Sequence, residues 1–414
     1  MKSISTIDRR RGAVSIFVVV FSALLITVVT ISFIRIMVND QDQASRNDLS
    51  QSAYDSAQAG VEDAKRALLR YYAACSATGN ATECARAREA VSSTTCNEMV
   101  RYGNVIGEDS EGETGPDGDA QYGEIKVQQR SNPGDEQLDQ AYTCVTAQLV
   151  TDDYLSSDPN PANTSTLVPL KVQAGRTFNT VTIEWFSADD MEGANTNGRV
   201  DLRSNVETPM PLLAQDKWPV TRPALMRAQF MQVGSNFTLN DFNAPADGES
   251  NANTVFLYPT SSDAAPHAVE ILGRDARKDN GTALKAEPYN APLPVRCQDV
   301  DTPRYSCKMS LTIPAPIGGG DRQAFLLLTP LYNKSQFRVT LSDGMTPQQF
   351  DGVQPIIDST GRANDMFRRV SSRVTLSDFP YPEGAVDVMG NFCKSFSVTD
   401  TKYYPGSGDF SCTP

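Results

Sequence analysis

The sequence has very little of the residue chemistry that enzymes use. Its 414 residues include one histidine, His267, so a Ser-His-Asp or Cys-His site would have to be built on that residue. No serine has the G-x-S-x-G surroundings of a hydrolase nucleophile, and the glycines at 318–320 lack the Lys and Ser/Thr of a phosphate-binding loop. Those glycines are more typical of a hairpin turn. We therefore expect a protein that is not an enzyme.

Positive charge and metal-ligand patterns are also scarce. The chain has 37 Lys and Arg against 50 Asp and Glu, a net charge of −13, which argues against a head that binds nucleic acid or anionic membranes. There is no CxxC and no His-containing ligand spacing, so zinc is not expected. No cofactor is expected apart from calcium, for which weak candidates are the oxygen-bearing side chains of Asp189, Asp190, Asn195 and Asn197.

The cysteines are even in number and all follow the N-terminal apolar run. They are Cys75, Cys84, Cys96, Cys144, Cys297, Cys307, Cys393 and Cys412. In an exported protein such a set indicates structural disulfides and an oxidising compartment outside the cytoplasm. We predict that nearest neighbours pair, giving Cys75–Cys84, Cys96–Cys144, Cys297–Cys307 and Cys393–Cys412.

Glycine and proline are missing from a long N-terminal stretch. Neither occurs between Ala13 and Ala59, and the first proline of the chain is Pro116. Ala13 to Ile34 is apolar and uncharged, and as a helix its roughly 33 Å would span a bilayer. The preceding leader, residues 1–12, is basic, so the positive-inside rule keeps it cytoplasmic and translocates the rest. We expect a stem helix over residues 13–72.

The second half of this expected helix has one narrow apolar stripe. Its members recur every three or four residues, at Leu49, Ala53, Ala57, Val61, Ala64 and Leu68. Small side chains permit helices to approach closely, so we interpret the stripe as a face that packs against helices of other subunits. The alternative is an ordinary membrane anchor followed by a stalk.

Three features follow one another at the N-terminus: a basic leader ending in Gly12, the apolar helix, and the segment AYDSAQAGVEDA at 53–64. Together they resemble the N-terminal region of PilX-type minor pilins of type IV pili, over about residues 9–70. Ala57, Ala59, Gly60, Glu62 and Ala64 match that family's pattern, whereas Gln58 stands where Glu is usual. The resemblance implies cleavage by a prepilin peptidase between Gly12 and Ala13. It also implies filament packing through the helix, for which the candidates are Phe17, Leu49, Ala53, Ala57, Gly60, Val61, Ala64 and Leu68.

Two positions depart from the pattern of major pilins. Such subunits carry Glu at the fifth mature position, where this chain has Phe17, and Ala13 replaces the more usual Phe or Met at the first. The mismatch favours a minor subunit that primes the filament. The implied partners are other pilin subunits, the peptidase, the inner-membrane assembly platform, and the surface of a host or neighbouring cell. The implied location is the cytoplasmic membrane before assembly and the cell surface afterwards.

Two other functions stay open on the sequence. One is a signal-anchored cell-surface binding protein outside any filament. The other is a pseudopilin of a type II secretion system, whose head contacts exported cargo. The C-terminal segment between Cys393 and Cys412 fits either an adhesive loop or a stapled chain end.

The remainder of the chain is expected to be rich in strands. Large apolar residues alternate with polar ones at 181–185, 309–313, 337–341 and 374–376, and further candidate strands are 142–150, 167–172, 224–233, 255–258, 324–328 and 394–399. A short helix is expected at 80–91. Pro- and Gly-rich segments separate the strands, which is typical of antiparallel sandwiches. The predicted fold class is therefore α+β: the stem helix, a first module with a Cys-rich acidic insertion (73–207), and a second β-rich module with the C-terminal disulfide loop (208–414).

Overall fold

The computed structural model combines a long N-terminal helix with mostly antiparallel sheet, an α+β architecture. It forms two compact units, which are described separately: unit 1 is Met1–Ala147 with Ile357–Ser372, and unit 2 is Gln148–Ile356 with Arg373–Pro414. The residues that the structure describes are 11–75, 79–102, 113–114, 120–121, 123–127, 140–156, 161–191, 199–202, 217–234, 252–261, 268–271, 277–279, 282–283, 292–300, 305–318 and 322–375.

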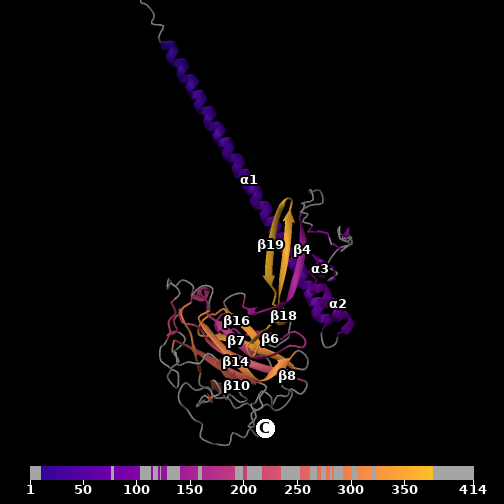
Figure 1. The fold of residues 1–414 in the computed structure, drawn as a ribbon. Helices are drawn as coiled ribbons and strands as arrows, with labels where there is room; N and C mark the ends of the chain where they lie inside the picture. The colour runs from indigo at the N-terminus through magenta and orange to yellow at the C-terminus, as the bar shows by residue number, and fades with distance from the viewer. Residues whose placement is uncertain are drawn as a thin grey trace, which may run out of the picture. The chain divides into compact units, whose positions relative to one another are not determined.

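Unit 1 begins with α1 (Arg11–Ala74), a continuous helix of 64 residues that confirms the expected stem (Figure 1). At about 1.5 Å per residue it is roughly 96 Å long. α2 (Ala81–Val91) confirms the expected short helix, and its N-cap is Asn80, whose Oδ1 accepts a hydrogen bond from the Thr82 N–H at 2.8 Å. α3 (Glu98–Tyr102) follows.

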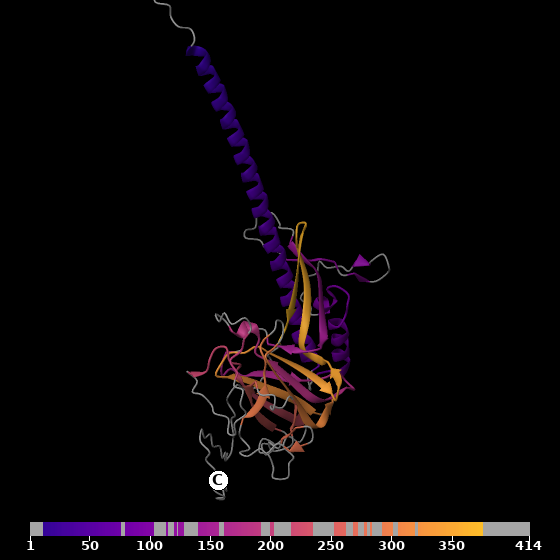
Figure 2. The ribbon, with the colours of Figure 1, turned by 60° about the vertical axis from the view of Figure 1, so that its left-hand side comes forward.

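The sheet of unit 1 lies beside the C-terminal half of α1 (Figures 1 and 2). Its order is β19-β18-β4-β3. The strands are β3 (Ile125–Lys126), β4 (Gln140–Thr151), β18 (Phe350–Ala363) and β19 (Met366–Arg373), and β1 (Glu113–Thr114) pairs separately with β2 (Ala120–Gln121). A two-residue connection joins β18 to β19, and its first residue, Asn364, has the positive φ of 49° that tight hairpin turns need.

The chain leaves unit 1 within β4 and returns to it within β18. Because these strands are neighbours in one sheet, the larger segment of unit 2, Gln148–Ile356, is an insertion between two strands of unit 1, and Arg373–Pro414 also belongs to unit 2. This division differs from the consecutive modules 73–207 and 208–414 expected from the sequence. Those boundaries were placed at Pro- and Gly-rich segments, which mark local turns but do not show that two strands distant in the chain pair with each other. Part of the expected boundary region, residues 203–216, lies outside the described residues.

Unit 2 contains two larger sheets with strands from both sides of that boundary. The first has the order β12-β11-β10-β14-β7-β16-β17, with β5 also on β16, and the second has the order β13-β9-β8-β15-β6. Pairing in both is antiparallel except for β10 with β14 and β13 with β9. The first sheet contains β5 (Tyr154–Leu155), β7 (Thr177–Trp185), β10 (Ala268–Ile271), β11 (Arg277–Asp279), β12 (Thr282–Ala283), β14 (Cys307–Gly318), β16 (Phe337–Asp343) and β17 (Thr346–Gln348). The second contains β6 (Thr166–Leu170), β8 (Leu225–Gly234), β9 (Ala252–Thr260), β13 (Leu293–Arg296) and β15 (Arg322–Leu331).

One hydrophobic core draws on both sheets of unit 2. The alternation expected along β7 is confirmed, because Val181, Ile183 and Trp185 are all buried in it, together with residues such as Val168 of β6 and Leu326 of β15. The alternating positions of β14 and β16 are buried in the same core.

Three strand expectations have other outcomes. Val374 lies just after β19 and is not part of a strand, while Leu376 and the candidate at 394–399 lie outside the described residues. The glycines at 318–320 were expected to close a hairpin, but β14 and β15 belong to different sheets. The hairpin prediction is therefore wrong, and the chain passes there from one sheet to the other.

Candidate functional site

The N-terminal half of α1 exposes a continuous apolar surface. From Ile16 to Val38 every side chain is exposed, Phe17 reaches 76 %, and Arg35 is the one charged residue among them. These 23 positions would extend about 34 Å along a helix, close to the thickness of a bilayer's hydrocarbon core. Among the described residues this is the one helix that is long and apolar enough to cross a membrane, judged by length and composition. It indicates membrane anchoring or a signal segment.

Hydroxyl groups within this apolar segment bond to its own backbone. Thr27 Oγ1 donates to the carbonyl oxygens of Ala23 and Leu24 at 2.9 and 2.8 Å, and Thr30 and Ser32 donate to the residues four positions earlier at 2.8 Å. A polar group in hydrocarbon must find such an internal partner, because no water is there to bond it. The segment is therefore compatible with lipid despite its hydroxyls.

The C-terminal half of α1 is buried by its own sheet, which corrects one interpretation of the sequence. The stripe was expected to contact helices of other subunits, yet Ala53, Ala57, Ala64 and Leu68 have no exposed area and Val61 has 5 %. Leu49, at the edge of the stripe, is half-buried, and Gly60 is buried. Small side chains here permit a helix to approach a sheet, so these residues are not available to neighbouring stems.

Two glycines show how closely helix and sheet approach in unit 1. A methyl group placed on Gly60 of α1 would meet Ser359, would lie 2.7 Å from Val145 Cγ2 and would lie 3.1 Å from the Tyr142 ring. One placed on Gly361 of β18 would overlap backbone atoms of Ala53 and Ala57. Sequence reasoning missed Gly361, because the stretch around it has no clear hydrophobic alternation that would identify a strand.

Polar side chains fix the helix on this sheet. Tyr142 of β4 donates its hydroxyl hydrogen to Asp63 Oδ2 at 2.8 Å, and Arg368 of β19 donates to Ser50 Oγ at 2.7 Å. Burial raises the pKa of the Asp63 carboxyl, while the bond from Tyr142 acts in the opposite direction. These contacts join α1 to two strands that are far apart in the sequence, β4 and β19.

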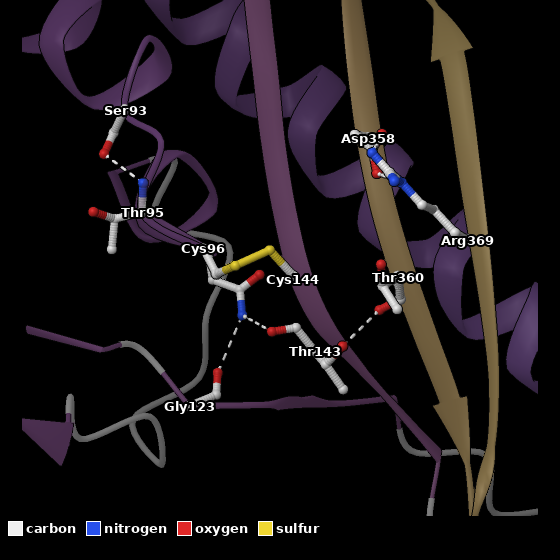
Figure 3. Close-up of a disulfide and its surroundings, with 10 residues drawn as sticks. Ser93, Thr95, Cys96, Gly123, Thr143, Cys144, Asp358, Thr360 and Arg369 are labelled. Carbon is white, nitrogen blue, oxygen red and sulfur yellow. Dashed lines mark hydrogen bonds and ion pairs between the residues drawn. A yellow bond between two sulfur atoms is a disulfide. The ribbon is translucent and has the colours of Figure 1, made fainter. Parts of the chain in front are cut away.

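Two disulfides lie in unit 1 after the C-terminal end of α1. Cys75, directly after α1, pairs with Cys84 of α2, and Cys96 pairs with Cys144 of β4, as predicted. Figure 3 shows the second bridge beside Thr143, whose Oγ1 donates to the Thr360 carbonyl oxygen at 3.3 Å. The buried Asn97 side chain donates to the Gly123 and Thr143 carbonyl oxygens at 3.1 and 3.2 Å, so α3, β3 and β4 meet at this bridge.

The third predicted disulfide, Cys297–Cys307, is present in unit 2. Cys393 and Cys412 lie outside the described residues, and so does His267. No described cysteine is free. Disulfides persist in oxidising compartments, so they indicate an extracellular head.

Two of the four calcium candidates lie within the described part of the chain. Asp189 and Asp190 lie in a short 3-10 helix, Ala188–Met191, where Asp189 is exposed and Asp190 is 1 % exposed. The Asp190 carboxylate accepts hydrogen bonds from the backbone N–H groups of Ser187 at 2.7 Å and Gln336 at 2.9 Å. Burial raises its pKa to about 6. Asp190 thus joins two backbone segments, and Asn195 and Asn197 lie outside the described residues.

The remaining predicted site residues lie at the start of α1. Gly12 and Ala13 are in its first turn, residues 1–10 are outside the described chain, and no side chain is described before Ile16. No group of three or more His, Cys, Asp or Glu side chains suited to a metal occurs within the described ranges.

No known protein family model matches the chain, and no curated protein matches it either.

Proposed function

We propose that this chain is a minor-pilin-like structural subunit of a type IV pilus-like filament. The observation that supports it is the division of α1 into two halves: an exposed apolar half at 16–38 and a half buried by the chain's own sheet. An exposed apolar helix on a disulfide-bonded head needs a second apolar environment, and it can exchange lipid for neighbouring helices without unfolding the head.

In this proposal the stem is first anchored in the cytoplasmic membrane, where a prepilin peptidase cleaves the chain between Gly12 and Ala13. The inner-membrane assembly platform then transfers the subunit into a filament. The surface offered to other pilin subunits is the exposed segment that includes Phe17, not the buried stripe. The head, in which the two sheets of unit 2 would form a sandwich around their shared core, is displayed outside the cell. There it primes assembly, contacts a host or neighbouring cell, or does both.

The decisive experiment determines the mature N-terminus. Mass spectrometry of the protein purified from its own cells is expected to find Ala13 as the first residue. Gly12→Val is expected to block cleavage, while Ser15→Ala, three positions away, leaves cleavage unchanged. An uncleaved chain beginning at Met1 would contradict the proposal and favour a signal-anchored surface protein.

A second measurement separates a pilin from a cell-bound pseudopilin. Filaments sheared from the cells are expected to contain the chain, and the Gly12→Val variant is expected to stay in the membrane fraction. Retention of the wild type entirely in the membrane fraction would assign it to a secretion system.

A further inference from the structure

The middle of α1 contains a stretch that is neither apolar nor covered by the sheet. Residues 39–48, between the apolar segment and Leu49, are exposed at all ten positions, and we call them the uncovered segment. Figure 1 shows the sheet of unit 1 beside only the later part of α1. At about 1.5 Å per residue the uncovered segment is roughly 15 Å long.

The side chains of the uncovered segment add little to the stability of the helix. Six of the ten are Asn, Asp or Ser, whose short polar groups compete for backbone hydrogen bonds and rank low in helix propensity. Asp42 and Arg46 have the spacing of a helical ion pair, yet neither they nor any other side chain of this described segment makes a hydrogen bond or an ion pair. Backbone bonds alone hold the segment in helical form.

Both neighbouring parts of α1 are held more firmly. In lipid, the backbone bonds of the apolar segment cannot open, because no water is there to replace them. After Leu49 the helix packs on the sheet, where Ala53, Ala57 and Leu68 have no exposed area. Within one protein, local stability is lowest where buried contacts are few and the backbone hydrogen bonds are exposed to solvent. Local opening of α1 is therefore concentrated in the uncovered segment.

One basic residue lies in the uncovered segment. Arg46 is the only Lys or Arg between Arg35, near the end of the apolar segment, and Lys65. Its bond to Asn47 precedes the whole part of α1 that packs on the sheet, and every cysteine of the chain follows it. A cut at this bond would separate the apolar segment from a head that keeps its helix–sheet contacts and its disulfides.

We propose that α1 opens at the uncovered segment and that a protease which cuts after arginine releases the head there. Water adds across the Arg46–Asn47 peptide bond, which leaves a carboxylate on Arg46 and an ammonium group on Asn47. A protease binds its substrate as an extended chain, so the rate of cleavage follows the population of the opened helix. This site goes beyond the proposed filament role and does not rest on it, because any membrane-anchored form of the chain contains it.

Limited trypsin digestion of the full chain in lipid nanodiscs tests the site. Mass spectrometry identifies the new N-termini over time, and the comparison concerns the bonds within α1. The bond after Arg46 is expected to be cut at least about tenfold faster than the bond after Arg66, and the head is expected to leave the nanodisc fraction. Arg66 is the internal control, because its side chain is 67 % exposed while its part of the helix packs on the sheet.

A double variant tests whether cleavage passes through opening of the helix. Asn39→Ala combined with Asp40→Ala raises helix propensity at positions that precede Arg46 by six residues or more. In the full chain this variant is expected to be cut about fivefold more slowly after Arg46. A synthetic peptide of residues 39–52 is the matched control. It is too short to form a stable helix in water, so the two substitutions should leave its cleavage rate unchanged.

Three results would overturn the proposal. Cleavage after Arg66 or Arg70 as fast as after Arg46 would show that exposure of the side chain decides, and not opening of the helix. An uncut Arg46–Asn47 bond at a trypsin concentration that digests the peptide completely would show that the segment stays helical. Equal rates for the wild type and the double variant in the full chain would show that cleavage does not depend on helix stability.

Discussion

Gly361 sets how closely β18 approaches α1. The atoms that a methyl group would overlap are backbone atoms of Ala53 and Ala57, which no side-chain rotation can remove. Gly361→Ala must therefore shift the helix from the sheet, and it is expected to lower the free energy of unfolding by about 2–3 kcal/mol. Urea unfolding of the full chain in detergent, followed by circular dichroism, measures this loss.

Gly123→Ala is the matched control in the same unit. A methyl group there would meet no atom within 4 Å, so a change of at most about 0.5 kcal/mol is expected. Equal losses in the two variants would show that glycine flexibility, and not the contact with α1, accounts for the effect.

Asp190 makes stability depend on pH. Its native pKa of about 6 exceeds the ordinary 3.8, mainly because the carboxyl is buried, so the native state binds the proton more tightly than the unfolded state. The resulting contribution of about 3 kcal/mol is present below about pH 4 and is lost as the pH rises through about 6. Asp190→Asn has no such proton to lose.

Unfolding free energies measured between pH 4 and 7 check this sign. The wild type is expected to lose stability relative to Asp190→Asn as the pH rises across this range. Parallel profiles for the two proteins would show that Asp190 has an ordinary pKa and that its bonds from Ser187 and Gln336 offset its burial.

At the scale of single elements, strong local patterns made some of the fold predictable. A long stretch without glycine or proline, apolar in its first part, predicted one long helix, and alternating large apolar residues identified β7. β18 was missed because its buried positions after residue 356 are Ile357, Ser359, Gly361 and Ala363. Small and polar residues stand there because the helix backbone comes so close, and this removes the hydrophobic alternation by which a strand is recognised.

The apolar stripe on α1 was recognised from the sequence, but the surface that covers it, the sheet of unit 1, was not. A close approach needs small side chains whether the opposite surface is a helix or a sheet, so Ala53 and Ala57 carry the same signal in both cases. Only the long-range pairing of β4 with β18 decides between them.

The two disulfides of unit 1 are expected to differ in their effect on stability. Cys96–Cys144 has a sequence separation of 48 and Cys75–Cys84 one of 9, so the first restricts the unfolded chain more. Replacing both cysteines of a bridge by serine is expected to cost about 4 kcal/mol for the first pair and about 3 kcal/mol for the second. Chemical denaturation of the two double variants gives the order, and a larger loss for the shorter loop would contradict this entropic account.

For the whole molecule, the division into two units separates the residues that hold the stem helix from the residues that build the large sheets. The stem and most of its sheet belong to unit 1, while the two large sheets belong to unit 2. The strands that hold α1 come from one segment before residue 148 and one after residue 356, so unit 1 has a closed set of contacts around the stem. Unit 2 can then vary in sequence without changing the exposed apolar surface of α1.

An internal deletion tests this separation. Joining Ala147 to Ile357 through Asn-Gly and ending the chain at Ser372 removes unit 2. The junction connects two neighbouring strands close to the bond from Thr143 to Thr360, so a tight hairpin can form. We expect the shortened chain to insert in the membrane and to form both Cys75–Cys84 and Cys96–Cys144, as shown by non-reducing peptide mapping. The matched control is the same deletion with Gly361→Ala, in which the helix cannot seat on the sheet and protease resistance should fall. Free thiols at Cys96 and Cys144 in the shortened chain would show that unit 1 needs unit 2 to fold, and this separation would then be wrong.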